Sequence, residues 1–304
     1  MLTSFADRTM FRVPGTQNYS VMASNHSIHA LMVGMSESWW RAGIMPCVRS
    51  DVERDKPVAY IMWLIEGPDG PIAVDTGYHP DYVAPEWAQG KNFIPPPALL
   101  SQIGVKADEI KTVIVTHFHQ DHFTGFDYFP NARFIVQQAE LEFWTGPLMR
   151  HEILNRQIRP KVRPALERLK EQGRIELIDG DFELYPGLDL LKAGGHTPGS
   201  QMVALQTDLG KAVLCGDIAY TFRNVRDHIP VGWYYHLGET AAALDRALAT
   251  VSHPDLAFPN HDTEIMQGKR VTRWSDAQRV TQSAKPCPPL SIRSARSPDL
   301  EAAW

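Results

Sequence analysis

Residues 117–122 read His-Phe-His-Gln-Asp-His, so three imidazoles and one carboxylate fall within six positions. The run follows the apolar residues 112–115, which predict a strand ending just before it. Polar side chains crowded at a strand end must each find a partner, because desolvating them without one is costly. A divalent metal ion would satisfy all four groups at once. The competing interpretation is a surface histidine cluster without a ligand.

Three further groups of the same chemistry follow in the chain. His196 lies in the turn 194–199, Gly-Gly-His-Thr-Pro-Gly, where glycine allows the backbone to approach a ligand closely. Asp217 and His261 each come shortly after a short apolar run, as residues at the carboxyl end of a strand do. Seven candidate ligands favour two metal sites, because one tetrahedral site would leave three or four polar groups over.

The combined pattern resembles the metallo-β-lactamase superfamily, specifically its dinuclear hydrolases, over residues 58–266. The family motif is His-x-His-x-Asp-His, then a histidine in a Gly-His-Thr-Pro-Gly turn, an aspartate and a final histidine. All seven positions are present here in that order. The resemblance implies an α/β fold, the αββα sandwich, with the metals at one edge between the sheets. It implies a first metal bound by His117, His119 and His196, a second bound by Asp121, His122 and His261, and Asp217 bridging them.

Two positions discriminate within the superfamily. Asp217 stands where the β-lactam-hydrolysing enzymes with a cysteine ligand carry that cysteine, so the resemblance disfavours antibiotic hydrolysis of that type. Cys215 lies in an apolar run and is interpreted as a small buried hydrophobe. Flavo-diiron proteins carry glutamate at the position of His119, whereas imidazole suits zinc. We therefore expect two zinc ions, although the same ligands also accept Mn, Fe or Co.

The same resemblance gives three side chains a role beside the metals. Asp75, at the end of a predicted hairpin, would position a ligand histidine; the alternative is a turn-capping aspartate. Tyr220, three residues after Asp217, would hydrogen-bond the substrate carbonyl as the equivalent tyrosine does in the N-acyl homoserine lactonases; the alternative is core packing. Asp121 would donate a proton to the departing alkoxide in addition to binding metal.

These assignments together predict a metal-dependent hydrolase that acts on ester bonds. It resembles the lactonases most, so we expect an N-acyl homoserine lactone or related lactone to be opened by a hydroxide that bridges the two metals. One alternative is a thioesterase of glyoxalase-II type, or another ester or phosphodiester hydrolase that uses the same site. The other is a metal-bearing ligand sensor without turnover.

Composition and charge agree with a single enzyme domain. The 304 residues are 43% hydrophobic and 21% charged, which is ordinary globular composition. A net charge of −5 offers no general basic surface to nucleic acid, so the expected partner is a small-molecule lactone or ester. The three cysteines show no CxxC spacing. We expect no membrane partner and a cytoplasmic location. A homodimer is implied only by the resemblance to lactonases.

We expect one metallo-hydrolase domain over residues 1–284 and a poorly ordered or extended tail over 285–304. Apolar patterns predict a hairpin at 58–75, helices at 98–104, 137–144 and 239–251, and strands at 133–136, 201–207 and 211–215. Residues 1–57 form an N-terminal elaboration and 145–172 an inserted cap, both outside the expected core, as is 221–238. Each segment would cover the metal edge, or be a surface elaboration or dimer contact.

Overall fold

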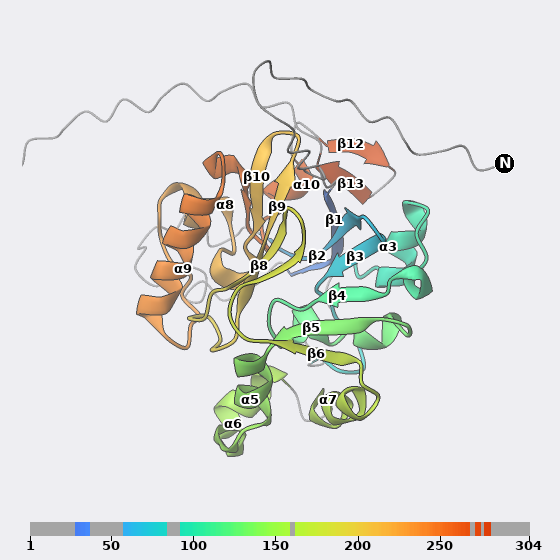
Figure 1. The fold of residues 1–304 in the computed structure, drawn as a ribbon, viewed down its shortest axis with the longest axis vertical. Coiled ribbons are helices and arrows are strands. Elements are labelled where there is room, and N and C mark those ends of the chain that lie inside the picture. The colour runs from blue at the N-terminus through green and yellow to red at the C-terminus, as the bar shows by residue number, and fades with distance from the viewer. Residues whose placement is uncertain are drawn as a thin grey trace, which may run out of the picture.

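The computed structural model describes residues 28–36, 57–83, 92–158, 162–267, 271–274 and 277–280. In this part of the chain two β-sheets pack face to face, and helices cover their outer sides (Figure 1). The predicted αββα sandwich is confirmed. The tail 285–304 and most of residues 1–57 lie outside the described residues, so the domain boundary at residue 284 stays a prediction.

The larger sheet has the strand order β12-β13-β1-β2-β3-β4-β5-β6. Strands β3 to β6 run parallel, and the other neighbours pair antiparallel. The carboxyl ends of β3 and β4 therefore meet at one edge of the sheet. The strands are β1 (Ile28–Ser36), β2 (Val58–Gly67), β3 (Gly70–Val74), β4 (Thr112–Ile114), β5 (Arg133–Gln137), β6 (Ile175–Ile178), β12 (Val271–Trp274) and β13 (Ala277–Val280).

The smaller sheet has the order β11-β10-β9-β8-β7. Strands β10 and β11 are parallel, and the other pairs are antiparallel. The chain leaves β8, β10 and β11 towards His196, Asp217 and His261, respectively. The strands are β7 (Phe182–Tyr185), β8 (Leu188–Lys192), β9 (Gln201–Thr207), β10 (Gly210–Leu214) and β11 (Ala257–Phe258).

Strand β2 shows why its apolar run is continuous. Successive side chains of a strand point to opposite faces of the sheet. Met62 and Leu64 pack beneath the helices of the larger sheet, whereas Ile61 and Trp63 pack between the two sheets. Because both faces are buried, both alternating sets of residues are hydrophobic.

The helices lie on the two outer faces (Figure 1). On the smaller sheet, Leu244 and Leu248 lie on the apolar side of α9 (Leu237–Thr250), as their spacing predicts, and Val251 packs there just after the helix ends. The larger sheet is covered by α3 (Pro96–Gln102), α4 (Gln120–Phe123), α5 (Gln138–Thr145) and α7 (Val162–Glu171). The remaining helices are α6 (Glu152–Ile158), α8 (Phe222–Arg226) and α10 (Glu264–Gln267).

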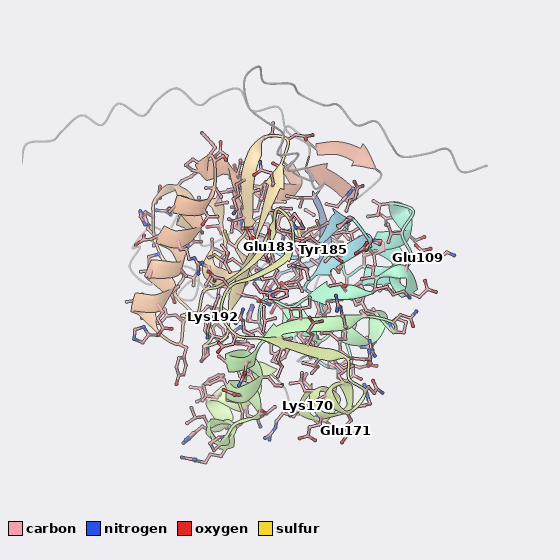
Figure 2. The ribbon with its side chains drawn as sticks, in the orientation of Figure 1. Glu109, Lys170, Glu171, Glu183, Tyr185 and Lys192 are labelled. Atoms are coloured by element: carbon pink, nitrogen blue, oxygen red, sulfur yellow. The ribbon has the colours of Figure 1, made fainter. Side chains whose placement is uncertain are left out.

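The segments expected outside the core have different places in the structure. Strand β1 lies between β13 and β2, so residues 28–36 belong to the larger sheet. In 145–172, Leu166 and Leu169 of α7 are buried against the same sheet. Charged side chains such as Lys170 and Glu171 lie on the outside of the molecule (Figure 2). Within the described ranges, no helix has the length and apolar character needed to cross a membrane.

Candidate metal centre

All seven side chains selected from the sequence lie together at one edge between the sheets. They form two groups, and in each group the potential ligand atoms lie within 4.8 Å of one another. The first group is His117, His119, His196 and Asp217, and the second is Asp121, His122 and His261. The larger sheet and α4 supply four of these residues, and the loops after β8, β10 and β11 supply three.

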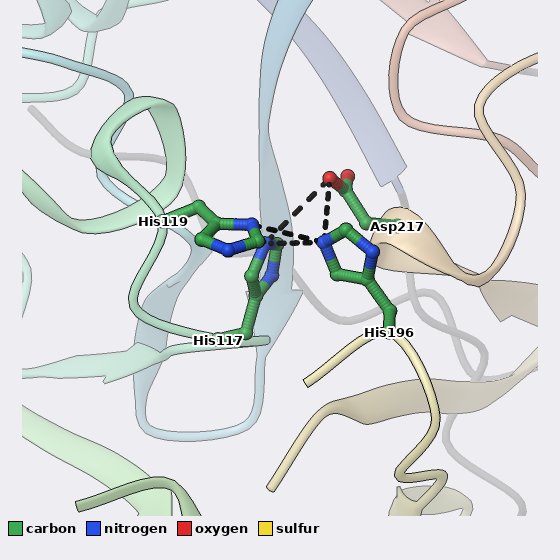
Figure 3. Close-up of side chains that lie close together, drawn as sticks. All are labelled: His117, His119, His196 and Asp217. Carbon is green, nitrogen blue, oxygen red and sulfur yellow. Dashed lines mark hydrogen bonds and ion pairs between the residues drawn. The ribbon is translucent and has the colours of Figure 1, made fainter. Parts of the chain in front are cut away.

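In the first group, three imidazoles and one carboxylate oxygen converge on a common point (Figure 3). His196 Nε2 lies 2.9 Å from His119 Nδ1 and 3.2 Å from His117 Nε2. The Oδ2 atom of Asp217 lies 3.2 Å from the same His196 nitrogen. A tetrahedral zinc ion separates its ligand atoms by about 3.3 Å, as follows from bonds of about 2.0 Å. The spacing therefore fits a metal ion.

The second group is built around the other oxygen of the same aspartate. Asp217 Oδ1 lies 2.9 Å from His261 Nε2 and 3.1 Å from His122 Nε2. Asp121 Oδ2 lies 3.3 Å from His122 Nε2 and 3.6 Å from His261 Nε2. Asp217 thus presents one oxygen to each group, as a bridging ligand does.

Two buried polar atoms of the second group also fit a metal. Asp121 Oδ2 and His122 Nε2 are inaccessible to solvent and have no hydrogen-bond partner. Buried polar atoms are almost always hydrogen-bonded, because an unmade bond costs the full desolvation of the group. A cation between them would satisfy both atoms.

In His196 and His261 the outer nitrogen of the ring is fixed by a hydrogen bond, which aims the other nitrogen at the centre. His196 Nδ1 donates to the carbonyl of Trp233 at 2.7 Å, and His261 Nδ1 donates to the carbonyl of Ala59 at 2.8 Å. A carbonyl only accepts, so the Nε2 atoms of these two rings carry the free lone pair. This arrangement is usual for histidines that bind metals.

Asp75 holds the outer nitrogen of His122. Its Oδ2 lies 2.7 Å from His122 Nδ1, and its two oxygens accept hydrogen bonds from the backbone and hydroxyl of Thr116. The residue is fully buried and has φ 62°, a conformation that non-glycine residues rarely adopt. Because its partners are 41 and 47 residues away, the carboxylate does not cap its own turn.

Burial and charge shift the pKa values of four of these imidazoles in opposite directions. Burial lowers the pKa of His119 to about 3 and that of His117 well below its usual range. Burial acts in the same direction on His122 and His261, but nearby carboxylates, chiefly Asp217, outweigh it and raise both pKa values. The two rings with lowered pKa values, His117 and His119, are therefore neutral at neutral pH, as histidine ligands of a metal must be.

Tyr220 lies at the rim of both groups. It is 1% exposed, and its ring centroid lies 5.2 Å from that of His261 and 5.9 Å from that of His196. Burial, then the negative charges of Asp217 and Asp121, raise its phenol pKa well above the ordinary value. The hydroxyl is therefore protonated at neutral pH and can donate.

Sequence reasoning missed several residues that shape the centre. Thr116 hydrogen-bonds both Asp75 and His117 Nδ1, but a threonine at a strand end carries no distinctive signal. The Trp233 contact uses the main chain, which no side-chain pattern reveals. Glu140 could have been noticed in the sequence, because it is an acidic residue four positions before Trp144 and therefore shares the buried face of α5.

A small apolar cavity of about 50 Å³ lies beside the first group. Leu154 reaches it from the segment 145–172, and an aromatic run reaches it from 221–238. The side chains around it are Phe143, Trp144, Leu154, His196, Thr197, Trp233, Tyr234 and Tyr235.

A larger cavity of about 490 Å³ lies at the other end of the parallel strands, around Thr112 and Arg133. Its basic side chains already have partners. Arg133 pairs with Glu176 at 2.8 Å, and Lys111 donates to a backbone carbonyl at 3.1 Å. The larger volume of this cavity is therefore no reason to regard it as the reactive site.

Comparison with known proteins agrees with this geometry. Two curated relatives are an N-acyl homoserine lactonase of Bacillus cereus, 30% identical, and AiiA of Bacillus thuringiensis subsp. kurstaki, 31% identical; each match covers 69% of this chain and 83% of the relative. A solved N-acyl homoserine lactone hydrolase with N-hexanoyl-L-homoserine at its metal centre has TM-score 0.63 and 24% identity, covering 82% and 98% of the two chains. The dizinc lactonase AidC has TM-score 0.61 and 20% identity, covering 79% and 89%. The model of the metallo-beta-lactamase superfamily matches residues 58–261, and the chain belongs to this superfamily.

Proposed function

We propose that this chain is a dinuclear zinc hydrolase that opens N-acyl homoserine lactones, or related lactones, to hydroxy acids. The observation that carries the proposal is the Asp217 carboxylate, which presents one oxygen to each group of ligands. This geometry supports two adjacent cations rather than one. The lactone substrate is supported by the curated relatives, which are N-acyl homoserine lactonases.

When bound, two zinc ions would supply hydroxide at neutral pH and polarise the ester carbonyl. Tyr220 donates a hydrogen bond from its hydroxyl to the carbonyl oxygen, and its raised pKa keeps the proton on the phenol. Burial opposes the charge of Asp121, but His122 and His261 outweigh it and lower the pKa of its carboxyl. Asp121 is therefore ionised, so it can accept the proton that the attacking hydroxide carries and pass it to the alkoxide when the ring C–O bond breaks.

We propose that the acyl chain lies against the aromatic residues beside the first group. Trp233 is 44% exposed and Tyr235 53%, so an unusual amount of aromatic surface is open to solvent here. Exposed apolar patches of this kind commonly mark ligand-binding sites. The cavity is too small for a long chain, so the chain would extend outward over these rings.

Zinc is our choice of metal because imidazole and carboxylate groups at this spacing are zinc ligands. Cytoplasmic residence and a homodimer complete the proposal. The homodimer follows from the resemblance to lactonases alone, and the location from the sequence pattern.

The test combines metal analysis with a pH-drop hydrolysis screen on one purified preparation. The panel contains acyl-homoserine lactones, simple γ- and δ-lactones, a glutathione thioester and a phosphodiester. Each lactone opening releases an acid, so turnover acidifies a weakly buffered solution. We expect about two zinc ions per chain, as the two groups require, and turnover of the lactones. A chelator-treated sample is the control.

Activity confined to the thioester or the phosphodiester would support the proposed metal centre but refute the proposal that the protein is a lactonase. Absence of stoichiometric metal after reconstitution would reject the whole proposal. Two bound ions with product binding but no turnover of any ester would identify a ligand sensor instead.

A further inference from the structure

Glu140 is a fully buried carboxylate that the proposed reaction does not use. It lies in the first turn of α5, whose apolar residues pack against the larger sheet. Burial raises its pKa, and hydrogen bonds to the carboxylate oppose that shift. Burying a charge costs free energy, and an apolar side chain is often at least as stabilising at such a place. Stability alone therefore does not explain this glutamate.

Four hydrogen bonds end on its two oxygens. Oε1 accepts from the backbone N–H of Phe118 at 2.8 Å and from the indole of Trp144 at 2.7 Å. Oε2 accepts from the hydroxyl of Thr197 at 2.7 Å and from the backbone N–H of Gly199 at 3.0 Å. All four partners donate, which is the set that an ionised carboxylate needs.

Three of the four donors come from the two loops that carry the histidines of the first group. Phe118 lies between His117 and His119, in the loop after β4 of the larger sheet. Thr197 and Gly199 follow His196, in the loop after β8 of the smaller sheet. One carboxylate thus joins the two loops, with one oxygen on each. Trp144 extends the link, because its ring lies edge-on to His119 with centroids 5.5 Å apart.

The packing around this link allows little movement. A Cβ atom added at Gly199 would lie 2.1 Å from the backbone nitrogen of Glu140, so only glycine lets the loop approach α5 this closely. On its other side, Gly195 is equally close to Thr240 of α9, where an added Cβ would lie 2.3 Å from the backbone nitrogen. The loop that carries His196 is therefore held between two helices.

We propose that Glu140 is a positioning residue that fixes His119 and His196 relative to each other and so sets the metal affinity of the first group. This inference rests on the proposed metal centre. Asp75 has the matching position in the second group, since it contacts His122 directly. Glu140 bonds the loops beside His119 and His196, whereas Asp75 reaches the first group only through Thr116.

The test measures how tightly each of the two ions is held in the Glu140→Gln variant. Glutamine keeps the size of the side chain but replaces one accepting oxygen by an NH₂ group, which faces donors. Variants are dialysed against a graded series of chelator concentrations, and anomalous zinc scattering from crystals gives the occupancy of each group. We expect the ion of the first group to be lost at about 10- to 100-fold lower chelator strength, the usual effect of removing such a partner. The ion of the second group should be retained.

Two variants serve as controls. Glu142→Gln makes the same change on an exposed position of the same helix and should behave as wild type. Asp75→Asn should reverse the pattern, with the ion of the second group lost first. Thr197→Val is the second variant if Glu140→Gln folds poorly, because it removes a single donor with little change of shape. The ion of the first group should again be lost selectively, but by a smaller factor.

Equal weakening of both ions, or wild-type retention in Glu140→Gln and Thr197→Val, would overturn the inference. That failure is distinct from failure of the proposed function. The proposed function fails on the wild-type protein instead, either because it does not bind two ions or because it does not turn over lactones.

Discussion

At the scale of single residues, Asp217 and Tyr220 owe their proposed roles to different features of the structure. Asp217 is shared between the two groups, so its role is set by position: each oxygen faces different imidazoles. The proposed role of Tyr220 depends on its environment, because burial and the nearby carboxylates raise its phenol pKa and keep the hydroxyl protonated. A side chain that acts only as a hydrogen-bond donor must stay protonated, and an environment that raises its pKa ensures this.

Tyr220→Phe should lower kcat by about 100-fold, the effect of losing one donor to a developing oxyanion, with zinc content unchanged. Because the phenol pKa is raised, the donor is present below that pKa and is lost only when pH rises through it. Wild-type activity should therefore show no loss from phenol ionisation up to its ordinary pKa of 10. The check is a pH–rate profile with acyl-homoserine lactone for wild type, Tyr220→Phe and a distant control, Tyr185→Phe. Equal kcat values in all three proteins would mean that Tyr220 serves only to pack the core.

At the scale of elements, apolar patterns predicted the strands and helices with clear boundaries. The hairpin of β2 and β3 has a Gly-Pro-Asp-Gly turn, and α9 has a regular apolar side. Strand β1 was not predicted, because it is buried on both faces and therefore has no alternation. Strand β11 has only two residues and is held by β10, which no local pattern encodes.

The seven clustered residues could be named from sequence because their chemistry and spacing are specific. Asp75 could be named as well, from the family resemblance, but the contacts of the other supporting residues could not be, and the reason is physical. Glu140 and Trp233 act through backbone N–H and C=O groups of distant loops. Every residue has such groups, so only the folded structure shows which ones meet.

The loop before α9 offers a prediction about substrate range. Trp233→Ala keeps the carbonyl that accepts from His196 but removes the exposed indole beside the cavity. We expect kcat/KM for a decanoyl lactone to fall by about 10-fold or more, from the apolar area lost, and that for a butanoyl lactone to change little. Leu237→Ala is the matched control, since Leu237 is similarly exposed (43%) but does not line the cavity. A uniform decrease for both lactones would mean that the indole does not contact the chain.

At the scale of the whole molecule, the metal centre joins the two sheets. Four of the clustered residues follow β4 of the larger sheet, and three follow strands of the smaller one. Bound ions therefore act as cross-links between the halves of the sandwich. Without them, two buried polar atoms, Asp121 Oδ2 and His122 Nε2, lack a hydrogen bond.

Removal of metal should consequently lower the melting temperature of the whole domain. Ligand held at about 1,000 times its Kd contributes about 4 kcal/mol, which for a chain of this size corresponds to roughly 10 °C. Calorimetry with and without chelator measures the shift, and zinc added in excess should restore it. An unchanged melting temperature in chelator would show that the ions do not hold the sheets together.

The order of the clustered residues along the chain has a consequence for biosynthesis. A ribosome makes His117, His119, Asp121 and His122 first, then His196 and Asp217, and His261 last. The first group can thus be complete while the strand leading to His261 is still being translated. The second group closes only after β11 has docked beside β10. Occupancy of the second group would report that translation has passed this strand, and a product terminated before it could mature at only one of its two groups.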